Sequence, residues 1–229
     1  CLAHTAAAGM TRSTVQPLHR LIVQFNLLPS LEVHPDHRDS IVTAPVWEAL
    51  STGPAGHKQL SAAILAREQL QDDWVTAFQT RERRVALLGW QALERLVLLA
   101  GVALNAAWVA TRIGRRDVAA IKTALGPELY GFAVGRARFL GDVAAWPEPR
   151  DSATVLPWVK RAGLRYLEGC TQQQPRAVAA RLKLRLPHLP SGERDAAETS
   201  LPLPEPAQAT ALFRKLAPEV GEPCISLLA

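Results

Sequence analysis

Histidines and aspartates gather at one point in the sequence, in the stretch from His34 to His37, with Asp39 close behind. Imidazole nitrogens and carboxylates can bind zinc and other transition metals, and the same groups serve as general acids and bases. This spacing would suit a metal-dependent hydrolase in which both histidines bind the ion. Pro35, however, breaks any helix that would aim the two rings together. The stretch is therefore interpreted first as a polar surface loop.

The other residues that could do chemistry are scattered. Cys170 and Cys224 have no histidine near them in the sequence and are expected to be buried thiols. Asp72 and Asp73 are adjacent and would diverge on a helix, which suits a helix cap better than a catalytic pair. No GxGxxG, P-loop lysine, GxSxG or HExxH motif occurs. The sequence thus predicts no catalytic residue, cofactor or metal site, and favours a binding or structural role.

Charge is the second pointer to function, because 26 Lys and Arg against 21 Asp and Glu give a net charge of +5. Such a balance is typical of proteins that bind nucleic acids, and a basic helical nucleic-acid-binding protein is the alternative interpretation. The basic residues are nevertheless dispersed and form no tract. They form two dense groups, and both are typical of solvated helix ends. The second group would also suit a helix C-terminus. The alternative is that the groups bind an acidic partner protein. These candidate partner-binding residues are Arg81, Arg83, Arg84, Arg115 and Arg116.

The elements that position these residues are organised around the apolar stretch at 81–113. As a helix it would be apolar over more than half of its circumference, which is typical of a central core helix. Glu94 and Arg95 interrupt it, and its uncharged part is shorter than the ~20 residues of a membrane span. Direct membrane insertion is therefore not expected. Gly89 and Gly101 within it predict a bend, a break into two helices or a close helix crossing.

Apolar residues recur at helical spacing in further segments, which prolines and glycines delimit. Residues 30–40 are expected to form a loop, and Asp72 or Asp73 to cap a short helix that buries Trp74, Val75 and Phe78. At 175–187 leucines alternate with basic residues as in a strand, but helix is favoured because no partner strand is evident. The remaining helices are expected at 18–28, 45–50, 57–70, 117–125, 127–140, 156–167 and 207–216.

Together these segments predict an all-α fold, a compact multi-helix domain around the central helical segment. Residues 1–10 are expected to be disordered or to extend upstream of a natural start at Met10. Residues 11–186 would form the main helical domain, and 187–206, rich in proline and charge, an exposed loop. Residues 207–229 would form a C-terminal helix and tail packed on the main domain. Three cysteines without a CxxC pair suit a reducing cytoplasm.

Three stretches carry a resemblance to a known family: FNLLPSLEVHPD at 25–36, LERLVLLAGVAL at 93–104, and RLKLRLP at 181–187, followed by a proline-containing loop and a short helix. In this order they resemble the SctK family of bacterial type III secretion, in its YscK/PscK branch. The resemblance implies a non-enzymatic cytoplasmic adaptor of the injectisome sorting platform, located at the cytoplasmic face of the inner-membrane base.

The resemblance also implies specific partners. The adaptor would link the cytoplasmic domain of the inner-membrane ring protein SctD to the pod protein SctQ, and through SctQ to SctL and the SctN ATPase. It would need no cofactor and no nucleic acid. The family supplies no residue motif for either interface, so the five arginines stand as a hypothesis from the sequence.

Overall fold

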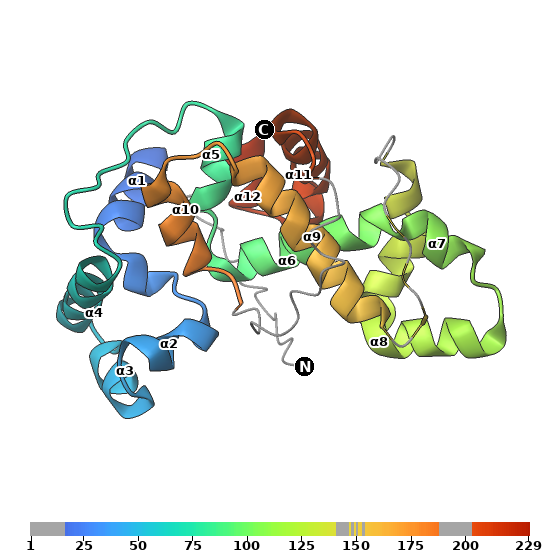
Figure 1. Ribbon diagram of the computed structural model, residues 1–229, viewed down its shortest axis with the longest axis horizontal. Helices are drawn as coiled ribbons and strands as arrows, with labels where there is room; N and C mark the ends of the chain where they lie inside the picture. Colours follow the sequence, from blue (N-terminus) through green and yellow to red (C-terminus); the bar gives the residue numbers. More distant parts are fainter. Residues whose placement is uncertain (1–16, 141–146, 148, 150, 153, 188–202) are drawn as a thin grey trace, which may run out of the picture.

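The computed structural model describes residues 17–140, 147, 149, 151, 152, 154–187 and 203–229. These residues form helices and no strand, which confirms the all-α prediction. Figure 1 shows α6 and α9 crossing at the centre, with α1–α4 and α10 to one side, α7 and α8 to the other, and α11 and α12 together on a third. Residues 1–10 and most of the predicted loop at 187–206 lie outside the described residues. No helix in the described part is both long and apolar enough to span a membrane.

The bounds of the elements set the frame for the candidate residues. In chain order they are α1 (Leu18–Leu27), η1 (Pro29–Leu31), α2 (Pro35–Ile41), α3 (Ala44–Leu50), α4 (Pro54–Arg67), α5 (Arg81–Arg84), η2 (Val85–Leu87), α6 (Trp90–Leu104), α7 (Ala106–Thr111), α8 (Arg115–Val134), η3 (Ala137–Phe139), α9 (Val155–Thr171), α10 (Arg176–Lys183), α11 (Pro206–Val220) and α12 (Cys224–Leu228), where η marks a short 3-10 helix. The favoured helix at 175–187 is confirmed as α10, although it ends at Lys183, four residues before the predicted end.

The central stretch at 81–113 is divided into four pieces. α5 passes into η2, and the chain then turns at Leu88 and Gly89, both extended, before α6 begins. α6 ends at Leu104, and α7 follows after Asn105 alone, whose side-chain amide donates a hydrogen bond to the Gly101 carbonyl at 2.7 Å. The predicted break at Gly89 is confirmed, while the second break falls at Asn105.

Gly101 lies where α6 and α9 cross closely, as the sequence predicts. α6 packs most extensively against α9, and a Cβ atom at Gly101 would lie within 2.7 Å of the Val159 carbonyl carbon. The contact is reciprocal, because a Cβ at Gly163 of α9 would lie 2.7 Å from the Val97 carbonyl carbon. Two glycines therefore let the two backbones touch where the helices cross.

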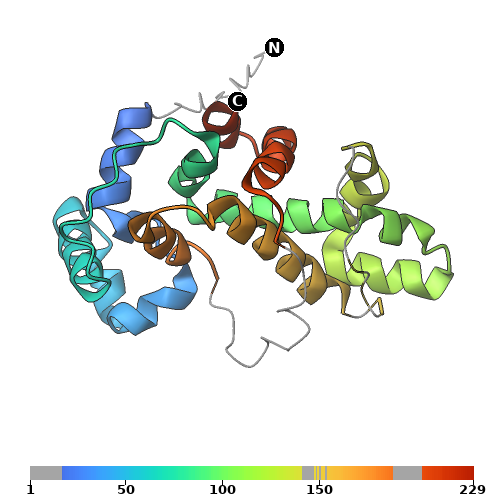
Figure 2. The same ribbon diagram turned by 45° about the horizontal axis from the view of Figure 1, so that its top comes forward.

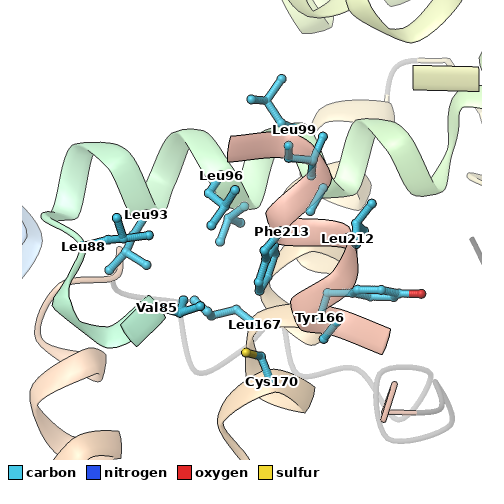
Figure 3. Packing of buried hydrophobic residues seen from close by; sticks show 14 of the residues in the cluster. Val85, Leu88, Leu93, Leu96, Leu99, Tyr166, Leu167, Cys170, Leu212 and Phe213 are labelled. Atoms are coloured by element: carbon cyan, nitrogen blue, oxygen red, sulfur yellow. The ribbon is translucent and has the colours of Figure 1, made fainter. Parts of the chain in front are cut away.

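A single large core surrounds this crossing. Figure 3 shows apolar side chains from α6, α9, α11 and the α5–α6 connection converging on one another. All of the labelled residues are buried: Val85, Leu88, Leu93, Leu96, Leu99, Tyr166, Leu167, Cys170, Leu212 and Phe213. α12 packs on α11 and on α5, and it buries Cys224, Leu227 and Leu228.

The predicted loop at 30–40 is wrong in its second half, which belongs to the short helix α2. Pro35 occupies the first turn, where a missing N–H costs nothing and a fixed φ favours helix. The His34 ring caps this turn, its Nδ1 accepting the Asp36 backbone N–H at 3.2 Å. Pro35, which is predicted to break a helix, begins one.

The predicted helix after Asp72 is also wrong, because residues 74–79 form an irregular segment that contacts α1. The Asn26 side chain of α1 donates to the Val75 carbonyl at 2.7 Å and accepts from the Val75 N–H at 2.8 Å. This pairing satisfies the backbone without a helix. Val75 and Phe78 are buried as predicted, whereas Trp74 is 57% exposed.

Glycine and proline positions set most of the remaining boundaries. α8 bends at Gly126, where φ is +78°, so the two helices predicted on either side of Gly126 and Pro127 are both present. The second of them ends at Val134, short of the predicted Leu140. α4 begins at Pro54, three residues before the prediction, because this proline also suits a first helical turn.

Candidate partner-binding surfaces

The histidine pair in the HPDH stretch is used inside the fold. The His34 ring lies edge-on to Trp90 at a centroid distance of 5.2 Å, and His37 Nε2 donates to the Leu186 carbonyl at 2.9 Å. Both histidines are buried, and they point to different neighbours. Among the described residues no group of three or more His, Cys, Asp or Glu side chains could hold a metal ion. The two histidines are therefore packing residues, His34 against α6 and His37 against the chain beyond α10.

The RLKLRLP stretch is a junction of the fold, a role that its alternating pattern did not predict. Arg185 is buried and donates to the carbonyls of Ala86 and Leu88, at 3.0 and 2.7 Å, and burial lowers its pKa to about 10. The Arg185 guanidinium also lies 5.2 Å from the Phe25 ring centroid. Leu184 joins a second, smaller apolar cluster with side chains from the α2–α4 region. The stretch therefore ties the α1–α4 side to the core and offers little surface to a partner.

The first arginine group lies on α5, and its side chains are used largely within the molecule. Arg83 donates to the Gln174 side chain and to the Ala77 carbonyl, each at 2.8 Å. Arg84 donates to the Phe78 carbonyl at 2.9 Å, and Arg81 to the Ala229 carbonyl at 2.7 Å. α5 is thus hydrogen-bonded to the irregular segment at 74–79 and to the residue that follows α12, and Arg81 is its one exposed arginine.

The second group differs, because Arg115 and Arg116 are exposed and form no hydrogen bond or ion pair with the residues that the structure describes. They lie in the first turn of α8, which corrects the expectation of a helix C-terminus. The positive end of the helix dipole lies here, so two cations cost a few tenths of a kcal/mol or more each. Folding stability therefore does not explain these two arginines.

The two groups are held apart by the central helix, as Figure 2 shows, with α5 near the start of α6 and the α7–α8 turn at the far end. The fifteen residues of α6 alone span about 22 Å at 1.5 Å per residue. The structure therefore does not bring the predicted residues into one site. It places them near opposite ends of α6, the helix that α9 crosses.

The two described cysteines have the properties of core thiols. Cys170 and Cys224 are both fully buried. Burial raises the pKa of Cys170 to about 11 and that of Cys224 to about 12. Cys170 Sγ lies 3.3 Å from the Thr210 hydroxyl. Protonated, buried thiols are poor nucleophiles, in agreement with the expectation from the sequence.

Comparison with known protein families gives a match over most of the chain. A family model described as YOP proteins translocation protein K (YscK) matches residues 22–229. No curated protein and no solved structure matches the chain. The match covers all three stretches that carried the resemblance at the level of sequence, together with both arginine groups.

Proposed function

Since the chain belongs to the YscK family of type III secretion proteins, we propose that it is a non-enzymatic cytoplasmic adaptor of the injectisome. In this role it links the cytoplasmic domain of the inner-membrane ring protein SctD to the SctQ pods of the sorting platform. SctQ in turn connects it to SctL and the SctN ATPase. The protein would work at the cytoplasmic face of the inner-membrane base, without a cofactor.

One observation carries this proposal beyond family membership: the candidate docking residues lie at two ends of an axis braced by the glycine-lined crossing of α6 and α9. An adaptor must contact two partners at once and hold them at a fixed separation. A helix pair in backbone contact resists bending, because any movement would open a close-packed core. The geometry supports one partner at each end.

We assign the partner contacts to the two arginine groups with different weights. Arg115 and Arg116 are exposed, and their guanidinium groups are available for carboxylates of a partner. Arg81, Arg83 and Arg84 also fasten α5, so charge reversal there would disturb the fold as well as a contact. A loss of binding at α5 therefore counts only when the variant is shown to remain folded.

Pairwise titration of the purified protein tests the adaptor function. The cytoplasmic domain of SctD and the pod protein SctQ are titrated separately, with duplex DNA as the control. Saturable binding to both proteins and none to DNA is the expected result. Binding to DNA alone, weakening steeply with salt, would support the nucleic-acid alternative instead. Binding to neither protein, with both partners folded, would overturn the proposal.

A further inference from the structure

The α7–α8 turn exposes an apolar side chain among cations. Ile113 is 89% exposed, more than any other large apolar residue described. Arg112 precedes it, and Arg115 and Arg116 follow after one glycine. We infer that this turn is a docking site for an acidic protein segment, in which Ile113 anchors an apolar side chain and the arginines bind the carboxylates around it. The inference rests on the proposed function and names the chemistry of one partner.

The turn is held in place by its neighbours. Arg112 lies over the buried Trp108 ring, at 4.7 Å from its centroid, and the Thr111 hydroxyl donates to the Trp108 carbonyl at 2.7 Å. α7 packs against α8 on one side and α6 on the other. Ile113 is thus presented from a short connection between two packed helices. A preorganised anchor of this kind loses little conformational entropy when a partner binds.

The local charge selects an acidic partner. Residues 112–117 contain three arginines and one acid, Asp117, which gives a net charge of +2. Asp117 already accepts a hydrogen bond from the Ser152 hydroxyl at 3.1 Å. The Arg115 and Arg116 guanidinium groups have no such partner among the described residues. Arginine binds carboxylates through two parallel N–H groups, so an acidic segment complements this surface in both charge and geometry.

The exposed Ile113 side chain indicates that the partner is a protein and not a nucleic acid. A phosphate backbone is bound by cations alone, and binding strength follows the number of charges neutralised. An isoleucine held at the centre of the cations adds nothing to such binding, but it fits the apolar centre and polar rim of a protein interface. The arrangement therefore favours a short acidic segment that carries one apolar residue.

Two variants of the full chain test this inference, Ile113→Asp and the double charge reversal Arg115→Glu with Arg116→Glu. Both should fold, since Ile113 is exposed and glutamate is favoured in the first turn of a helix. Val46→Asp, an exposed aliphatic residue on α3, is the matched control for the first. Reversal of Arg20 and Arg214, which are exposed on α1 and α11, is the control for the second.

Three probes are titrated by fluorescence anisotropy against each variant: the SctD cytoplasmic domain, SctQ, and a labelled peptide of glutamates around one central leucine. The same peptide with serine for leucine, and duplex DNA, complete the set. We expect each test variant to lose tenfold or more in affinity for one of the two proteins and for the leucine peptide. The controls, and affinity for the other protein, should change less than threefold.

The outcomes separate this inference from the adaptor function. If the wild type binds both proteins and every variant binds them equally well, the docking site is overturned and the adaptor function stands. If neither protein binds but the leucine peptide does, and both test variants abolish that binding, the site is supported and the adaptor function fails. DNA binding lost on charge reversal but kept in Ile113→Asp, without peptide binding, would overturn the site as a protein surface.

Discussion

Gly101 and Gly163 occupy the crossing of α6 and α9, and replacement of Gly101 by alanine should destabilise the protein measurably. The new Cβ would lie 2.7 Å from the Val159 carbonyl carbon and closer still to its oxygen. Ordinary contacts of this kind begin near 3.4 Å, so the two helices would have to move apart. The obstacle is backbone in the middle of a helix and cannot rotate away.

The expected loss of folding stability in Gly101→Ala follows from two opposing effects. Overpacking of a core typically costs about 1–3 kcal/mol, and this site should lie near the upper end because backbone is displaced. Alanine recovers about 1 kcal/mol of helix propensity. The net loss is about 2 kcal/mol, or a fall in Tm of about 4–8 °C for a domain of this length. Urea denaturation followed by circular dichroism at 222 nm measures it.

Gly131 of α8 supplies the matched control, because a Cβ there would meet nothing within 4 Å. Gly131→Ala should be neutral or stabilising by up to about 1 kcal/mol. The double variant of Gly101 and Gly163 should cost less than the sum of the two single variants, since separation of the helices relieves both clashes. Full additivity, or a Gly101→Ala protein as stable as the wild type, would refute the close crossing.

Three further predictions concern the parts that surround this axis. Asn26→Ala should cost about 3 kcal/mol in urea denaturation and remove hydrogen-exchange protection at Val75, because both backbone groups of Val75 lose their buried partner; retained protection would contradict this. Arg83→Ala should cost about 1–2 kcal/mol through its two lost hydrogen bonds, whereas Arg116→Ala should stay within about 0.5 kcal/mol; equal effects would contradict the different roles of the two groups. Burial raises the pKa of Cys170 from 9.0 to about 11, so the stabilisation from its protonated thiol is present below pH 9 and is lost as the pH rises through about 11. The urea midpoint should therefore fall less steeply across this range in Cys170→Ala than in the wild type, and identical slopes would refute this.

Local patterns were sufficient to predict the helical class and the centre of the core. The apolar periodicity of 81–113 identified the central element, and Gly89 and Gly101 marked a break and a crossing. The bend at Gly126 followed from the same reasoning, since glycine followed by proline is a helix boundary. These features depend on residues close together in the sequence, which is why sequence reasoning reached them.

The features that were missed depend on distant partners. The irregular segment at 74–79 is held by hydrogen bonds from Asn26, nearly fifty residues away, and no local pattern contains that information. Arg185 alternates with leucines as a surface residue would, yet it is buried and donates hydrogen bonds to the carbonyls of Ala86 and Leu88. Proline at 35 was interpreted as a helix breaker, although at the first turn proline favours a helix.

The candidate surfaces could be predicted only in part. The clustering of arginines was visible in the sequence, but the internal use of Arg83 and Arg84 depends on residues brought together by folding. The exposure of Ile113 has the same origin, because a lone isoleucine beside an apolar helix is expected to be buried. Tertiary packing therefore decides which cluster is available to a partner.

The most direct test of the adaptor account is whether both partners bind one molecule at once. The purified protein, the SctD cytoplasmic domain and SctQ are mixed at saturating concentrations and analysed by size-exclusion chromatography with light scattering. Two separate ends predict a single species that contains all three proteins. If SctQ displaces the SctD domain instead, both partners compete for one surface and the account is wrong.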